Sequence, residues 1–295
     1  MNLQQDPLPG RLPDFVVVGA PKAGTTSIHR YLGEHPEIGM SPDKGPRFFG
    51  EGEGTNFQKG LDWYRSLFQS DRPRCGEVSA VYSTYPTNLV ASRMAQIIPQ
   101  ARLVYLVREP WARMISHHKM HVRNPLRETL SLADDLQANP KLRHASRCGL
   151  QVAFLQEFFP PEQILVLEST YLSDATPAAM REIFQFVGVS PDFTSPLFLQ
   201  KINTSQQGEL RAQRYAAAKF RRTQPGTMPQ PELPPPTVAA TPVGDSSARV
   251  LIPANLIREL HDEYCREVDQ LRLLTRQPFP SLEVPPLADL MANHT

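Results

Sequence analysis

The chain has 295 residues, enough for one large α/β domain or two small ones. Its 31 Lys and Arg side chains nearly balance 30 Asp and Glu, so the overall charge gives no indication of a nucleic acid or an anionic membrane as partner. The cysteines Cys75, Cys148 and Cys265 lack metal-ligand spacing. No signal peptide or membrane-spanning apolar run is visible, so the sequence indicates a soluble cytoplasmic protein of undetermined oligomeric state.

Strand-like and helix-like segments alternate along the chain. Apolar runs without polar alternation, as in a parallel sheet buried on both faces, predict strands at residues 15–19, 75–79, 102–107 and 163–168. Helical spacing of apolar residues predicts helices at 25–34, 60–68, 87–98, 110–123, 145–159, 176–187 and 253–275. This alternation predicts an α/β fold with a central parallel sheet flanked by helices.

We expect one domain over residues 1–295. Its α/β core is predicted at 12–223, and a helix within 250–276 is predicted to pack on that core. The proline-rich segment 224–245 is expected to be a mobile loop rather than a domain boundary, because only one helix follows it.

The turn between the first predicted strand and helix has the features of a phosphate-binding loop. Gly19 and Gly24 have the separation of the two Walker A glycines, but the lysine, Lys22, lies inside the turn instead of after the second glycine. Backbone amides and hydroxyl groups at the start of this helix are suited to an anion. The predicted phosphate-binding residues are Lys22, Ala23, Gly24, Thr25, Thr26 and Ser27. The alternative is an ordinary glycine turn of an α/β protein.

A second phosphate-binding group is predicted after the third strand. Arg108 follows this strand, at the place where a metal-dependent nucleoside triphosphatase has an aspartate that holds magnesium. Ser116 lies eight residues further on, in a predicted helix, and an arginine fork with a serine hydroxyl suits a phosphate. Two separate phosphate sites without a metal fit 3′-phosphoadenosine 5′-phosphosulfate (PAPS). Alternatively, Arg108 is a solvated residue at a strand end.

At these residues the chain resembles the PAPS-dependent sulfotransferases, in the bacterial branch related to the carbohydrate sulfotransferases. APKAGTTS (20–27) is similar to the family's 5′-phosphosulfate loop, and LVREPWARMIS (106–116) to its 3′-phosphate segment. Segments 40–49, 76–86 and 158–172 resemble other family segments in the same order.

The resemblance implies a P-loop-kinase-like sulfotransferase fold and metal-free, in-line transfer of the sulfuryl group of PAPS. The implied acceptor is a hydroxyl, or an amine, of a small molecule, carbohydrate or lipid, and the nucleotide product is 3′-phosphoadenosine 5′-phosphate (PAP). Positioning and charge stabilisation dominate such transfers. Lys22 would bridge the sulfate and the 5′-phosphate as a catalytic cation. Arg211 and Arg214 lie in the basic stretch 201–222, which is either a solvated helix face or, as the resemblance implies, a segment that reaches the phosphates.

The catalytic base is the point at which the chain departs from this family. Gly45 occupies the position of the glutamate expected in the family's Lys-Glu-Pro segment, and glycine cannot accept a proton. We expect another residue to serve as the base. The first candidate is Glu77, at a predicted strand end, the second is His117, whose ordinary pKa is about 6.5, and the third is Asp43.

Two other functions and one other type of site stay open. Because of Gly45, the chain is alternatively a PAPS- or bisphosphate-binding protein with weak catalysis, and its glycine loop also allows a small-molecule P-loop kinase. His117, His118 and His121 have the spacing of helical metal ligands, but no third-ligand motif follows, so no metal is expected.

Overall fold

The structure is a computed structural model that describes residues 10–52, 54–124, 129–200 and 250–294. The expectations for segment 224–245 and for Arg211 and Arg214 lie outside these residues. The proposed single domain over 1–295 therefore stays a prediction.

Five parallel strands form one central sheet, and this confirms the predicted fold class. They are β1 (Phe15–Gly19), β2 (Ile38–Met40), β3 (Arg74–Val78), β4 (Arg102–Val107) and β5 (Ile164–Glu168), in the spatial order β2-β3-β1-β4-β5. Four of the strands lie within one residue of the predicted bounds. The edge strand β2 was not predicted, because three residues are too few to show a periodic pattern.

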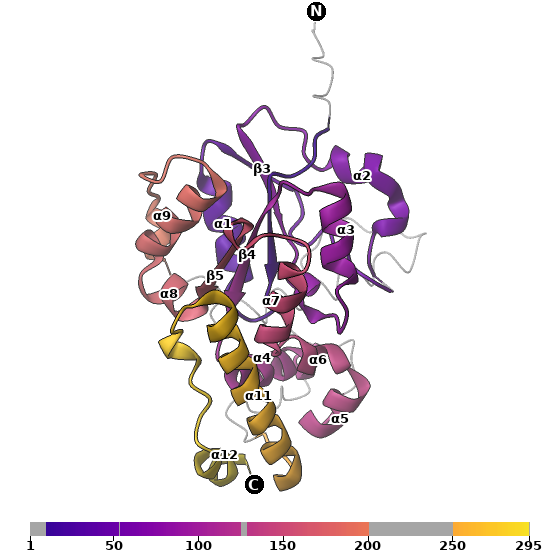
Figure 1. Cartoon of the computed structure of the whole chain (residues 1–295), viewed down its shortest axis with the longest axis vertical. Coiled ribbons are helices and arrows are strands. Elements are labelled where there is room, and N and C mark those ends of the chain that lie inside the picture. The colour runs from indigo at the N-terminus through magenta and orange to yellow at the C-terminus, as the bar shows by residue number, and fades with distance from the viewer. Residues whose placement is uncertain (1–9, 53, 125–128, 201–249, 295) are drawn as a thin grey trace, which may run out of the picture.

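The helices surround this sheet, with α1, α8 and α9 grouped on one side of the view in Figure 1 and α2 and α3 on the other. Their bounds are α1 (Thr25–Glu34), α2 (Gly60–Ser66), α3 (Leu89–Ile97), α4 (Pro110–Val122), α5 (Leu132–Ala138), α6 (Pro140–His144), α7 (Cys148–Gln156), α8 (Ser169–Asp174), α9 (Thr176–Val187), α11 (Ala254–Thr275) and α12 (Leu287–His294). All seven predicted helices are present. The others are short, and this is why their periodicity was not apparent. Within the described ranges, no helix combines the length and apolar character that crossing a membrane requires.

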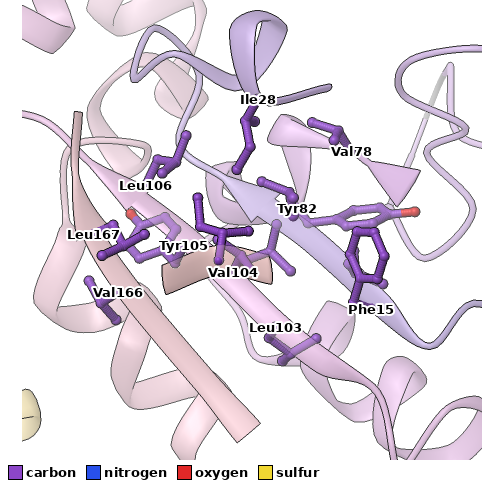
Figure 2. Packing of buried hydrophobic residues seen from close by; sticks show 14 of the residues in the cluster. Phe15, Ile28, Val78, Tyr82, Leu103, Val104, Tyr105, Leu106, Val166 and Leu167 are labelled. Carbon is purple, nitrogen blue, oxygen red and sulfur yellow. The ribbon is translucent and has the colours of Figure 1, made fainter. Parts of the chain in front are cut away.

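The main core lies around the two central strands. Every residue of β1 is buried, as are Leu103 to Val107 of β4. Figure 2 shows Phe15 of β1 and Leu103 to Leu106 of β4 among the buried side chains of neighbouring elements. A second, smaller core joins α4 to the C-terminal helices through Trp111, Met114, Ile257, Leu260 and Tyr264. The C-terminal helix α11 packs along α7.

The order of the strands reverses between β1 and β4. From β1 the chain crosses to β2 and β3 on one side, and then to β4 and β5 on the other. In open α/β sheets, ligands bind outside the carboxyl ends of the strands at such a reversal. The residues that follow these ends are the loop 20–24, the segment 41–50, Ser79 and Arg108.

Candidate active site

The loop after β1 leads directly into α1 and has an unusual backbone. Gly24 caps the helix at φ +95°, a left-handed conformation that glycine adopts without a steric penalty. Lys22 is also left-handed, at φ 72°. The backbone amides of Ser27 and Ile28 donate to the carbonyl of Gly24, which starts the helix. The amide of Ala23 also donates, to the carbonyl of Ala20. Amides in the first turn of a helix have no intrahelical acceptor, so those of Thr25 and Thr26 suit an anion.

Lys22 lies in a crowded group of cations. Burial, followed by the nearby charges of Arg108, Arg123 and Arg113, lowers the pKa of its ammonium group. Like charges held close together repel one another, and a bound anion relieves that repulsion. The positive charges around Lys22 therefore favour the binding of a multiply charged anion.

Arg108 lies against the loop after β1. Its Nη1 donates a hydrogen bond of 3.0 Å to the carbonyl oxygen of Lys22. Burial lowers the pKa of its guanidinium, which still stays charged at neutral pH. The structure thus brings together two predicted residues that are far apart in the chain. Ser116 lies about two turns along α4 and is half-buried.

The start of α4, and with it the position of Ser116, is fixed by a residue that the sequence analysis did not single out. The carboxylate of Glu109 accepts hydrogen bonds of 2.6 Å from the backbone amides of Trp111 and Ala112. Pro110 occupies the first position of the helix, where no amide hydrogen is needed. The Glu-Pro pair before an amphipathic run was a usable signal for this cap.

Lys44 is a second cation beside the loop after β1, and the sequence did not indicate it as a site residue. Its Nζ lies 2.8 Å from Thr26 Oγ1 and 3.3 Å from Thr25 Oγ1, at the N-terminus of α1. No local pattern predicts this contact, because Lys44 comes from the segment after β2 and reaches α1 only through the fold. Hence Lys44 and Lys22 both border the place predicted for the 5′-phosphosulfate.

The structure places Glu77, the first-ranked base, inside the protein. Its side chain is 0% exposed. The hydroxyls of Tyr64 and Tyr82 donate to Oε1 at 2.8 and 3.0 Å, and that of Ser79 donates to Oε2 at 3.1 Å. Burial, partly opposed by these hydrogen bonds, raises the pKa of Glu77 to about 7. A carboxylate enclosed in this way presents no open face to an acceptor, so this geometry gives no support to Glu77 as the base.

His117, the second-ranked base, is buried and engaged. Its Nδ1 lies 3.1 Å from Nη1 of Arg113, a fully buried guanidinium that can only donate. Neutral His117 therefore carries its proton on Nε2, and neither ring nitrogen is suited to accept one. Asp43, the third candidate, has an exposed side chain.

Gly45 has a conformation that explains why glycine is present. Its φ is +84°, and φ of the nearby Arg47 is 55°. A Cβ at Gly45 would have its nearest neighbours, Arg47 Nε and the carbonyl oxygen of Val78, at 4.0 Å. Space is thus available for a side chain at Gly45, but its backbone conformation opposes one.

The other histidines of α4 fasten it to α5. Nδ1 of His118 and Nδ1 of His121 both lie 2.9 Å from Oδ2 of Asp135, and Asn139 donates to the same carboxylate. Burial by itself would raise the pKa of Asp135, but the hydrogen bonds from the two histidines outweigh it and lower the pKa. Across the described segments, no group of three or more His, Cys, Asp or Glu side chains is arranged to hold a metal ion.

Comparisons with known proteins agree on one family. A family model described as the sulfotransferase domain matches residues 12–220. Bifunctional heparan sulfate N-deacetylase/N-sulfotransferase 2 from Bos taurus is 30% identical over 202 residues, and the protein of the same name from Mus musculus is 31% identical over 203 residues. In each comparison the match covers 61% of this chain and 22% of the relative, so the chain spans about a fifth of the length of these relatives.

A solved structure confirms the fold. The crystal structure of a sulfotransferase from Alicyclobacillus acidocaldarius superposes with a TM-score of 0.64 at 24% identity, covering 92% of this chain and 99% of that one. The expected P-loop-like sulfotransferase fold is therefore correct. The kinase alternative receives no support from these comparisons.

Proposed function

This chain belongs to the sulfotransferase domain family, and we propose that it transfers the sulfuryl group of PAPS to a hydroxyl or amine of a small-molecule, carbohydrate or lipid acceptor. The observation that carries this proposal is the hydrogen bond between Arg108 and the carbonyl of Lys22. It unites the two predicted phosphate-binding segments at the carboxyl edge of the sheet, at a point where a metal-dependent enzyme would have an aspartate.

The side chains at this edge fit the proposed donor. Lys22, Lys44 and Arg108 surround the N-terminus of α1, where backbone amides and the hydroxyls of Thr25 and Thr26 add donors. When bound, PAPS supplies an activated sulfuryl group and a phosphate leaving group. We assign its 5′-phosphate to the loop from Lys22 to Ser27 and its 3′-phosphate to Arg108 and Ser116, with Arg211 and Arg214 as further phosphate contacts.

Lys22 and Arg108 have distinct tasks in this proposal. Lys22, whose left-handed backbone and burial fix its position, stabilises the charge that develops on the leaving phosphate. Arg108 holds the carbonyl of Lys22 and so maintains the shape of the loop. Because the groups are already oriented before substrate binds, little reorganisation is needed during transfer.

The relatives suggest the class of acceptor. Their names specify heparan sulfate and N-sulfotransferase activity, which is transfer to an amine of a carbohydrate. We therefore place a carbohydrate first among the acceptors, with an amine or hydroxyl as the reacting group. An amine is partly unprotonated near neutral pH when its pKa is low, so it depends less on a strong base than a hydroxyl does.

The proton acceptor is proposed to be Asp43, the one of the three candidates whose side chain is exposed. The conformation of Gly45 and the enclosure of Glu77 also favour a second function. In that case the protein is a PAPS- or bisphosphate-binding protein with weak catalysis.

An acceptor screen with sulfur-labelled PAPS, run beside calorimetry with PAP, tests these functions. We expect PAP to bind without magnesium, and much more tightly than AMP or ATP, and we expect label to enter a carbohydrate. PAP binding without any labelled product would favour the second function, whereas equal affinity for PAP and AMP would contradict the two-phosphate site.

A further inference from the structure

Residues 44–50, here termed the Lys44 segment, run from the end of β2 past the end of β3. Two backbone amides of this segment are held by hydroxyl groups. The amide of Arg47 donates to Oγ of Ser79 at 3.1 Å, and the amide of Phe49 donates to the hydroxyl of Tyr82 at 3.2 Å. Figure 2 shows Tyr82 among the buried side chains, with its hydroxyl directed away from Tyr105.

Both hydroxyls also donate a hydrogen bond to the same buried carboxylate, that of Glu77. Tyr82 donates to Oε1 of Glu77, and Ser79 donates to Oε2. Because each hydroxyl oxygen already accepts an amide hydrogen, its O–H must find another acceptor, and a carboxylate accepts on every side. Two chains of hydrogen bonds therefore begin in the Lys44 segment and end on Glu77.

This anchoring holds the Lys44 segment in a strained shape. Arg47 has φ 55°, a left-handed conformation that is sterically unfavourable for a non-glycine residue. Strain of this kind persists only where the surroundings fix it. The amide of this same residue is bonded to Ser79, so the hydroxyl chain acts at the strained position.

The Lys44 segment begins at the phosphate-binding loop. Lys44 Nζ is 2.8 Å from Thr26 Oγ1, at the N-terminus of α1. Between Lys44 and the anchored amide of Arg47 stand only Gly45 and Pro46, and Pro46 is buried. The position of the ammonium group thus depends on where the two hydroxyl chains hold the backbone.

We propose that Glu77 is a positioning residue. Acting through Tyr82 and Ser79, it fixes the Lys44 segment so that Lys44 serves as a second cation for the anion bound at the N-terminus of α1. This inference rests on the proposed function for the identity of the anion. The anchoring itself rests only on the hydrogen bonds of the protein.

Two tyrosines provide a matched pair for the test. Tyr64 and Tyr82 both donate to Oε1 of Glu77 from buried positions. Only the hydroxyl of Tyr82 also receives an amide hydrogen from the Lys44 segment among the described residues. Tyr82→Phe and Tyr64→Phe make the same chemical change and keep the ring, but only the first removes an anchor.

The first measurement is hydrogen–deuterium exchange of the peptide that contains residues 41–50, in the full chain without ligand. We expect Glu77→Gln, Ser79→Ala and Tyr82→Phe to increase exchange at Arg47 and Phe49 at least several-fold, and Tyr64→Phe to leave it close to wild type. Equal exchange in the two Tyr→Phe variants would overturn the anchoring.

The second measurement is the affinity for PAP by calorimetry. We expect Lys44→Met to weaken binding about 10-fold or more, and Tyr82→Phe about 5-fold, as expected for a charged and a neutral hydrogen bond. In the Lys44→Met background, Tyr82→Phe should cause little further loss, because its effect acts through Lys44. Glu263→Gln weakens the ion pairs of Glu263 with Arg143 and Arg147, so any effect that it has on PAP affinity should add independently to that of Lys44→Met.

The outcomes distinguish failure of the positioning role from failure of the proposed function. If wild type fails to bind PAP, the proposed function fails, and the role of Lys44 fails with it, while the exchange data still decide the anchoring. If wild type binds PAP but Lys44→Met binds it equally well, or Tyr82→Phe and Lys44→Met are fully additive, the positioning role is overturned and the proposed function stands.

Discussion

Arg108 donates a hydrogen bond of 3.0 Å to the carbonyl oxygen of Lys22, across a separation of 86 residues. Arg108 follows β4, and Lys22 lies in the loop after the neighbouring strand β1. Since one group of the pair holds the backbone of the other, substitutions of Arg108 are expected to affect the phosphate-binding loop as well as any phosphate that Arg108 itself contacts.

Replacing Arg108 should weaken PAP binding much more than AMP binding. We expect Arg108→Ala to cost about 1.5–3 kcal/mol of the binding free energy of PAP, the range for a charge-assisted hydrogen bond. AMP lacks the 3′-phosphate, so its affinity should fall less, through the loosened loop alone. Calorimetry with both nucleotides measures the difference. An equal loss for PAP and AMP would show that Arg108 only braces the loop.

Replacing Lys22 should depress turnover more than donor affinity. If Lys22 stabilises charge that appears during transfer, Lys22→Met should lower kcat by about 10²-fold or more, while the Kd for PAP rises less. Lys59→Met makes the same change at an exposed lysine outside the site and should leave both constants unchanged. A Lys22→Met enzyme with normal kcat and only a raised KM would identify Lys22 as a binding residue.

Binding of PAP should be accompanied by proton uptake at Lys22 at alkaline pH, below the ordinary lysine pKa of 10.5. Burial and the nearby Arg108, Arg123 and Arg113 lower the pKa of Lys22 in the free protein, and a bound phosphate raises it again. The complex then holds more protons than the free protein between these two pKa values, so affinity weakens as pH rises through that interval. At this pH the phosphates themselves are fully ionised. Calorimetry in buffers of different ionisation enthalpy should detect the uptake in wild type, and its persistence in Lys22→Met would assign it to another group.

The ionisation of Glu77 should make the protein less stable as the pH rises. Its pKa is about 7 in the folded protein and lies near 4.5 when unfolded, so the folded state holds the extra proton between these values. The free energy of unfolding of wild type, relative to Glu77→Gln, should therefore fall from about pH 4.5 to 7 and then level off. The hydroxyls of Tyr64, Tyr82 and Ser79 face this carboxylate, and the two tyrosines stay neutral because their pKa values are raised well above 10. Urea unfolding across this range measures the trend, and a flat difference would refute it.

Gly45 should be needed for the shape of the Lys44 segment. Gly45→Ala should destabilise the protein by about 1 kcal/mol, because φ of +84° disfavours any Cβ even though space is available. Thermal unfolding measures this cost. Gly45→Glu should carry a similar cost and also adds a carboxylate. If Gly45→Glu turns over faster than both wild type and Gly45→Ala, the chain lacks an effective base, whereas equal turnover of the two variants would show that a base is supplied elsewhere.

The sequence by itself determined the four longer strands, seven of the helices and the positions of the two segments that we propose bind phosphate. Uninterrupted apolar runs such as FVVVG and RLVYLV are local patterns, and so is a glycine turn with one displaced lysine. Local patterns of this kind survive folding because the backbone conformation that they favour is the one that the strand or turn adopts. For the same reason the three-residue strand β2 and the short helices escaped prediction.

Only the tertiary structure decided which side chains meet and how far each is exposed. Lys44 reaches Thr26 because β2 and β1 end at the same edge of the sheet, and the sequence holds no record of that proximity. Glu77 ends a strand as predicted, but the hydroxyls of Tyr64 and Tyr82 donate to it inside the protein, and this enclosure gives no support to Glu77 as the base. Likewise, a hydrogen bond from Arg113 to Nδ1 makes His117 poorly suited to act as a base. Residue type fixes what a side chain can do, but its burial and its hydrogen-bond partners come from distant parts of the chain, and they decide what it does.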